Sequence, residues 1–256
     1  MDFGLAGKHA LVLGASSGLG LGSAQALAAE GAAVTIASSN AEKLGAAAKT
    51  LAGAAKVETQ VCNLSDAASV VTLLERVPQS DVLVLNGGGP PPGPVLDVDD
   101  DVWRAQFQAM FLSLAAIARA HAPGMRERGF GRVIFITSSG TIQPIQGLGI
   151  SNTIRKAVTG FAKTLANEVA RDGVTVNCVA PGRIDTARLM SLDEKAAARR
   201  GMSVDAVRAE SLGRIPTGRF GTAEEFGAVV CFLASRQAAY VNGSIIKVDG
   251  GLVGVP

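Results

Sequence analysis

The sequence is poor in aromatic and in charged residues. Aromatic side chains make up 4% of the 256 residues, with one Trp and one Tyr, and charged residues make up 18%. The 24 basic and 22 acidic residues nearly cancel to a net charge of +2, without a basic run or an aromatic stacking platform, which argues against a nucleic-acid partner. No apolar run reaches the ~20 residues of a membrane span, so we expect no membrane partner.

Cysteine is scarce as well. The three cysteines, Cys62, Cys178 and Cys231, cannot all pair with one another, and their spacing matches no metal site. Residues 1–8 contain Asp2 and no basic region ahead of an apolar stretch, unlike a secretory signal. We therefore predict no metal site and a cytoplasmic location, where thiols stay reduced.

Short apolar runs alternate with helix-length, Ala-rich segments along the chain. Strands are predicted at residues 9–13, 34–37, 56–61, 81–85, 132–137, 174–179 and 244–248. Helices are predicted at residues 19–30, 41–51, 66–77, 99–128, 151–171 and 223–235. This alternation predicts a Rossmann-like, doubly wound α/β fold with a mainly seven-stranded parallel sheet, flanked by helices on both faces. Strands of this kind should be buried on both faces.

One domain over residues 1–256 accounts for the pattern, because no linker, repeat or change of composition interrupts it. The polar helical segment 187–214 is inserted before the last βα unit, where an open α/β sheet binds ligands. A solvated surface hairpin is the alternative. Its arginines could attract an anionic substrate, but acidic neighbours favour a solvated mixed face; the arginines are Arg188, Arg199, Arg200, Arg208 and Arg214.

A glycine-rich turn joins the first predicted strand to the first predicted helix. It reads GASSGLG at residues 14–20, a GxxxGxG variant of the better-known GxGxxG. Glycines let the backbone turn sharply and approach a diphosphate, and the helix N-terminus offers it N–H groups and partial positive charge. Because a strand precedes the turn and a helix follows it, we expect a dinucleotide rather than a purely structural turn.

The end of the second strand indicates which dinucleotide. An Asp or Glu there would accept a hydrogen bond from a ribose 2′-hydroxyl and repel a 2′-phosphate. This chain has Ser38, Ser39 and Asn40 instead, with no carboxylate before Glu42. Hydroxyl and amide donors can hold phosphate oxygens, so we expect NADP, with NAD as the alternative because no arginine follows the strand.

Motifs across essentially the whole chain resemble the short-chain dehydrogenase/reductase family. The matching segments are GASSGLG (14–20), NGGG (86–89), the Ser138-Ser139 turn, GFAKTLANEVA (160–170), VNCVAPGRIDT (176–186), RFGTAEEFGAVVCFLAS (219–235) and VNGSIIKVDGG (241–251). The segment GGPPPGP (88–94) is similar to a divergent branch related to 3-oxoacyl-carrier-protein reductases. The resemblance implies a homotetramer or homodimer, and the fourth and fifth predicted helices and residues 250–256 could pack across twofold axes.

The resemblance also implies the contacts of the cofactor. The diphosphate site would be formed by Gly14, Ser16, Ser17, Gly18, Leu19 and Gly20. Asn63 and Leu64 would flank the adenine, with Asn86 and Gly87 beside the adenosine ribose. The nicotinamide amide would be held by Pro181, Gly182, Ile184 and Thr186. A helix cap at Asn63 and plain turn chemistry at Pro181-Gly182 are the structural alternatives.

The reactive positions of the family do not carry over. The family typically uses Ser, Tyr and Lys, with an Asn on the fourth helix. An ungapped alignment on Gly160 places Ser138, Ser151 and Arg155 in the first three positions and Met110 in the last. A rival alignment uses Asn152 and Lys156 but needs a one-residue deletion. The chain's single Tyr lies far away, at position 240, and has a structural interpretation.

These substitutions imply altered chemistry. Ser151 can hydrogen-bond a carbonyl oxygen but is a poor proton donor, and Arg155 is a permanent cation that cannot relay protons. We favour an NADP(H)-dependent oxidoreductase acting on a carbonyl/alcohol pair of a small-molecule substrate, with Ser138 and Ser151 orienting the substrate oxygen and water as the proton source. A second hypothesis is an NADP(H)-binding protein with little or no catalysis, a sensor or an oligomer partner. A third is a non-redox lyase or dehalogenase-like enzyme in which Arg155 holds an anion, since arginine in the lysine position resembles halohydrin dehalogenases.

Overall fold

A single parallel sheet organises the protein. The computed structural model describes residues 2–51 and 55–255, and within them seven strands are ordered β3-β2-β1-β4-β5-β6-β7. The direction of winding reverses between β1 and β4, which opens a crevice at their carboxyl ends. The strands are β1 (His9–Leu13), β2 (Ala33–Ser38), β3 (Lys56–Val61), β4 (Val82–Leu85), β5 (Gly131–Ile136), β6 (Val174–Pro181) and β7 (Ile245–Val248).

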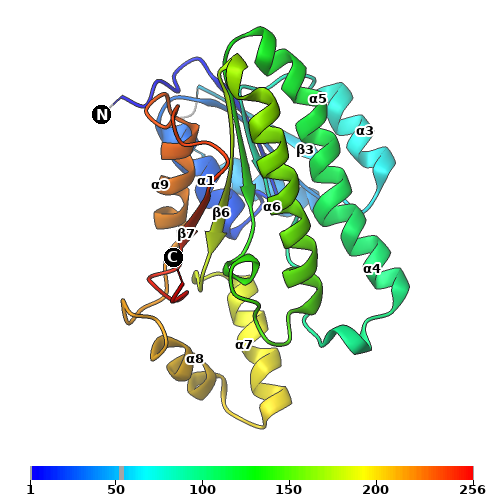
Figure 1. The fold of residues 1–256 in the computed structure, drawn as a ribbon, viewed down its shortest axis with the longest axis vertical. Coiled ribbons are helices and arrows are strands. Elements are labelled where there is room, and N and C mark those ends of the chain that lie inside the picture. The colour runs from blue at the N-terminus through cyan, green and yellow to red at the C-terminus, as the bar shows by residue number, and fades with distance from the viewer. Residues whose placement is uncertain (1, 52–54, 256) are drawn as a thin grey trace.

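Helices cover both faces of the sheet, as the sequence predicts (Figure 1). The helices of one face are α1 (Gly18–Ala29), α2 (Ala41–Ala48) and α9 (Ala223–Ala234). The helices of the other face are α3 (Ala67–Arg76), α5 (Ser113–Glu127) and α6 (Gly149–Val169). Two further helices, α7 (Ala187–Arg200) and α8 (Val204–Leu212), lie beyond the sheet at the bottom of Figure 1. No helix in the described ranges is both long and apolar enough to cross a membrane.

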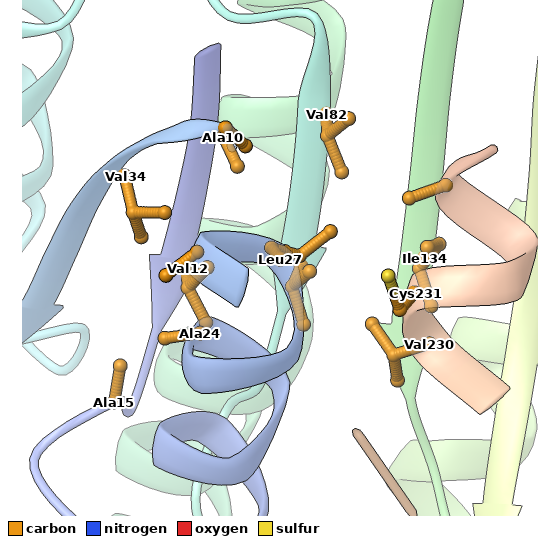
Figure 2. Packing of buried hydrophobic residues seen from close by; sticks show 14 of the residues in the cluster. Ala10, Val12, Ala15, Ala24, Leu27, Val34, Val82, Ile134, Val230 and Cys231 are labelled. Atoms are coloured by element: carbon orange, nitrogen blue, oxygen red, sulfur yellow. The ribbon is translucent and has the colours of Figure 1, made fainter. Parts of the chain in front are cut away.

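Alternate residues of the central strands form two cores. Val12 of β1 packs into the core beneath α1 and α9, whereas its neighbours Leu11 and Leu13 pack into the core beneath α3, α5 and α6. Figure 2 shows Ala24 and Leu27 of α1 on the same side of the sheet as Val12. Because every inner strand has helices above and below it, most side chains on both faces are apolar; Arg132 of β5 and Asn177 of β6 are buried polar exceptions.

The two edge strands are exposed, which contradicts the prediction that all strands are buried on both faces. In β3, four of six residues are exposed, and in β7 none is buried. Each edge strand has only one neighbour in the sheet. The β3 sequence, KVETQV, contains only two apolar residues, which suits a strand with solvent on one side.

The single helix predicted over residues 99–128 is divided. Helix α4 (Asp100–Phe107) continues into a π-helical turn (Gln108–Leu112) and then into α5. Met110 of this π-turn is buried against the loop that follows β4, where a Cβ on Gly87 would lie 2.9 Å from Met110 Cα. The predicted helix 41–51 is also shorter, since α2 ends at Ala48.

A buried carboxylate fastens the inserted helices. Asp193 of α7 is 1% exposed and accepts hydrogen bonds from Arg183, in the loop after β6, and from Arg208 of α8, at 3.3 Å. On the surface, Arg200 of α7 pairs with Glu210 of α8 at 2.7 Å. Residues 187–214 are therefore two helices joined through shared ion pairs.

Candidate functional site

A pocket of about 330 Å³ opens at the carboxyl ends of the central strands. Residues expected to bind cofactor or substrate line it together, although they come from five separate segments. They are Gly14, Ser17, Gly18, Leu19, Asn86, Ser138, Ser151, Arg155, Pro181, Gly182, Ile184 and Thr186. The remaining expected residues lie outside its lining: Ser16, Gly20, Ser38, Ser39, Asn63, Leu64 and Gly87.

The glycine turn is shaped by close backbone contacts. Gly14 has a φ of +60°, and a Cβ on it would lie 2.7 Å from Asn86 Nδ2. A Cβ on Gly20 would lie 2.3 Å from the backbone oxygen of Gly14, so α1 can begin here only without a side chain. Ser17 is the N-cap of α1 but makes no capping hydrogen bond through its side chain. The first amides of α1 therefore remain available to an anion.

Two polar segments flank this turn on the side of β2 and β3. Ser16 Oγ and Ser38 Oγ lie 2.9 Å apart, and Ser39 is exposed. Asn63 Oδ1 accepts a hydrogen bond from the amide of Ser65 at 3.1 Å, and the backbone oxygen of Leu64 accepts from Ser113 Oγ at 2.7 Å. These contacts hold the segments but leave the hydroxyl groups of Ser38 and Ser39 near the start of α2.

Two serine hydroxyls face the pocket. Ser138 follows β5, and its Oγ accepts a hydrogen bond from the amide of Gly140 at 3.1 Å. The Ser138 hydroxyl proton is therefore free to be donated elsewhere. Ser151 is buried in the first turn of α6 and makes no side-chain hydrogen bond to another described residue. The pocket thus offers two hydroxyl donors to a ligand oxygen.

Arg155 lies one helical turn after Ser151 and is almost completely buried, with 9% of its surface exposed. Its Nη1 donates to the backbone oxygen of Ile136 at 2.7 Å, and its Nη2 donates to the backbone oxygen of Gly88. Its Nε is buried and has no partner among the described residues. Burial, and to a smaller extent the nearby charge of Arg188, lower the pKa of Arg155 to about 10.

The two residues of the rival alignment, Asn152 and Lys156, make hydrogen bonds that hold the backbone. The side chain of Asn152 bonds both backbone groups of Ile145, accepting from its N at 3.2 Å and donating to its O at 2.8 Å. Lys156 Nζ donates to the backbone oxygen of Thr141 at 3.1 Å. Neither residue lines the pocket. The geometry therefore favours the ungapped alignment, with Ser151 and Arg155 at the pocket.

Arg188 is a pocket residue that the sequence assigned to a solvated mixed face. It lies in the first turn of α7, and its Nη2 donates to the backbone oxygen of Pro90 at 2.5 Å. A Cβ on Gly89 would lie 2.6 Å from Arg188 Nε, so the guanidinium rests directly on that glycine. The sequence did offer one signal for Arg188, its position two residues after the expected cofactor residue Thr186. The contact with Pro90 could not be foreseen, because the two residues are 98 positions apart.

A second hollow of about 550 Å³ continues from the pocket past Ser138. It shares Ser138, Leu148, Gly182, Leu189 and Leu192 with the first pocket. Its further walls combine apolar residues, such as Ile145, Leu252 and Val253, with polar ones that include Arg183 and Arg214. A substrate body of mixed polarity can therefore extend away from the serine hydroxyls.

Other candidates for chemistry lie elsewhere. Tyr240 is fully exposed, and His121 is buried in α5 with its Nδ1 2.9 Å from the backbone oxygen of Ile117. The three cysteines are buried and unpaired, and burial raises the pKa of Cys178 and of Cys231 to about 12. No cluster of three metal-ligating side chains occurs in residues 2–51 and 55–255.

Comparisons with known proteins agree with this geometry. A family described as Enoyl-(Acyl carrier protein) reductase matches residues 14–253. The chain is 34% identical to a 3-oxoacyl-(acyl-carrier-protein) reductase of Salmonella typhimurium over 259 residues, which cover 96% of this chain and 97% of that protein. The structure of L-sorbose reductase from Gluconobacter frateurii, solved with NADPH and L-sorbose, matches this chain with a TM-score of 0.93 and 31% sequence identity. The match covers 100% of each chain. A second structure, named short chain dehydrogenase/reductase family protein, matches this chain with a TM-score of 0.87 and 31% sequence identity, again over 100% of each chain.

Proposed function

Because the chain belongs to the short-chain dehydrogenase/reductase family, we propose that it is an NADP(H)-dependent oxidoreductase that interconverts a carbonyl and an alcohol. One observation carries the proposal: the two serine hydroxyls line the same pocket as the glycine turn and the Pro181–Thr186 loop. Substrate oxygen and cofactor would therefore meet at the carboxyl ends of β1, β4, β5 and β6.

The residues around the glycine turn fit a dinucleotide. The cradle made by Gly14 and Gly20 has no room for a Cβ, and the uncapped amides of α1 face it. No carboxylate stands at the end of β2, where the paired hydroxyls of Ser16 and Ser38 could donate to a 2′-phosphate. The solved relative from Gluconobacter frateurii was complexed with NADPH, which supports NADP over NAD.

The proposed reaction divides its tasks among few residues. When bound, NADP(H) supplies or accepts the hydride. Ser138 and Ser151 hold the substrate oxygen by donating hydrogen bonds that strengthen as negative charge develops on it. Arg155 adds positive charge behind the pocket and keeps its place through Ile136 and Gly88. No phenol lines the pocket, so the proton of the product hydroxyl comes from water.

A reduction screen tests the proposal. We expect purified protein to oxidise NADPH in the presence of at least one member of a panel of aldehydes, ketones and oxo acids. Ser138→Ala and Ser151→Ala should each lower kcat by about 100- to 1,000-fold, as loss of a donor to a developing oxyanion does. Lys156→Met, on the same helix but outside the pocket, is the matched control and should keep full activity. NADPH turnover that ignores both serine substitutions would contradict the assignment.

A nucleotide-binding protein without turnover is the second candidate, favoured by one observation. The family's phenol is missing, because the single Tyr of the chain, Tyr240, is exposed outside the pocket. Fluorescence titration separates the candidates: NADPH that binds and is never oxidised across the panel would establish the second one. Protein that binds neither NADPH nor NADH would end both.

We also propose that the chain forms a homo-oligomer in the cytoplasm. Phe107 of α4 and Leu112 of the π-turn are 39% and 44% exposed and lie five residues apart along one helical segment, where a second copy could cover them. They belong to the fourth of the helices predicted from the sequence, one of the two expected to meet a second copy. Buried, unpaired cysteines are compatible with a reducing compartment.

A further inference from the structure

The wall of the pocket has positive charge and no negative charge. Arg155 lies deep in it and Arg188 lies at its mouth, where part of the side chain is exposed. No Asp or Glu is among the residues that line the pocket. Within the described residues, neither guanidinium forms an ion pair, in contrast to Arg183 and Arg208, which share Asp193.

The protein satisfies these two cations only with neutral oxygens. Arg155 donates to the backbone oxygens of Ile136 and Gly88, and Arg188 donates to that of Pro90. The two arginines thus hold consecutive parts of one loop, residues 88–90, from opposite sides. Carbonyl oxygens place the guanidinium groups but do not cancel their charge.

Donor capacity is left over at both groups. The Nε of Arg155 is buried without a partner, and only the Nη2 of Arg188 is used in a hydrogen bond to another described residue. A guanidinium fork matches the oxygens of a carboxylate or a phosphate. The uncapped N-terminus of α1 contributes further partial positive charge at the same pocket.

We propose that Arg155 and Arg188 form a binding site for an oxyanion, a carboxylate or phosphate group, in which Arg188 makes the direct contact and Arg155 supplies charge from behind. The site deepens the proposed function and rests on it for the source of the anion, which is either the diphosphate of the cofactor or an acidic group of the substrate. Arg188 is a specificity determinant in either case.

Calorimetric titration of the full chain tests this site and separates the two sources. ADP-ribose carries the diphosphate without a nicotinamide, and oxalate carries carboxylates without a nucleotide; oxalate is titrated with and without saturating NADP. The variants are Arg188→Gln, which removes the charge, Arg188→Lys, which keeps the charge without the fork, and Arg199→Gln. Arg199 is the matched control because it lies on the same helix but outside this pocket.

We expect Arg188→Gln to weaken binding by about tenfold or more, with Arg188→Lys intermediate and Arg199→Gln unchanged. A loss confined to ADP-ribose assigns the site to the cofactor diphosphate, and a loss confined to oxalate assigns it to an acidic substrate. Affinity should also fall between about 50 mM and about 500 mM NaCl, and fall less steeply in Arg188→Gln.

The proposal is overturned if Arg188→Gln matches the wild type for both ligands, or if the wild type binds neither of them. These outcomes differ from failure of the proposed function, which is the absence of NADPH oxidation across the carbonyl panel or of NADPH and NADH binding by the wild type. Oxalate binding that depends on Arg188 would support the anion site even then.

Discussion

Arg155 Nη1 lies 2.7 Å from the backbone oxygen of Ile136 and joins helix α6 to the end of strand β5. Through Nη2 the same guanidinium reaches Gly88 in the loop after β4. One side chain therefore fixes the relative positions of a helix and two strand ends around the pocket, a task that a single ammonium group cannot perform at both oxygens with the same geometry.

Arg155→Lys should consequently destabilise the fold. One of the two buried carbonyl oxygens would lose its donor, which costs about 1–3 kcal/mol. Urea unfolding followed by circular dichroism measures the change. Lys156→Met is the control, since it removes one bond at the other side of the helix and should cost less than about 1 kcal/mol. An unfolding free energy equal to that of the wild type would show that the two carbonyl contacts contribute little.

Helices α1 and α9 touch through their backbones, and a substitution there has a predictable cost. A Cβ on Gly22 would lie 2.4 Å from the backbone oxygen of Ala223. Gly22→Ala should therefore destabilise by about 1–3 kcal/mol through overpacking. Gly45→Ala, in the exposed helix α2 with open space around it, should stabilise by about 0.5–1 kcal/mol. Thermal unfolding of the pair checks both signs, and equal shifts in one direction would contradict the packing argument.

His121 should make stability depend on pH in mildly acidic solution. Burial lowers the pKa of His121 below its ordinary value of 6.5, and its Nε2 is buried without a partner. As the pH falls below about 6.5, the unfolded chain binds a proton that the folded chain resists, so the free energy of unfolding decreases. Above that pH the histidine is neutral in both states, so the free energy of unfolding no longer changes with pH through His121.

Melting temperatures of wild type and His121→Gln, recorded from about pH 7.5 to about pH 5, measure this contribution. The loss of stability on acidification should be smaller in His121→Gln. His9→Gln is the control that removes the other histidine and keeps His121. Parallel curves for wild type and His121→Gln would refute the role of His121.

If the proposed oligomer forms through the surface of α4 and the π-turn, only substitutions on that surface should change the molecular mass of the particle in solution. The wild type should elute as a dimer or tetramer in size-exclusion chromatography with light scattering. Combining Phe107→Asp with Leu112→Asp should shift the protein toward the monomer, because charge opposes burial of that surface. Val71→Asp, at an exposed apolar position of α3, should leave the mass unchanged. A monomeric wild type would remove the oligomer from consideration.

Local patterns explain what could be predicted from the sequence. The run His9–Leu13, a histidine followed by four apolar residues, predicts β1 with its observed bounds, because a strand covered on both faces leaves a continuous apolar run. Ser151 and Arg155 come from the family resemblance, because an ungapped alignment on Gly160 places them in the Tyr and Lys positions, four residues apart and therefore on one face of a helix. Both line the pocket that the glycine turn also lines.

Features that depend on distant segments escaped the sequence. The contact of Arg188 with Pro90 joins residues 98 positions apart, so its neighbours in the chain suggested only a solvated face. The position of β3 at the edge of the sheet depends on which distant strands pair, and this the local sequence does not give. The π-turn at Gln108–Leu112 carries no local signal, and its Met110 lies close to Gly87 of a separate segment.

The shared ion pairs of Asp193 have a consequence for the wall of the pocket that α7 forms. Because Arg183 anchors this carboxylate to the loop after β6 while Arg208 anchors it to α8, the two inserted helices are tied to each other and to the end of the sheet. The contact of Arg188 with Pro90 ties α7 to the loop after β4 as well. A ligand therefore meets a wall whose shape is set by charged side chains far apart in the sequence.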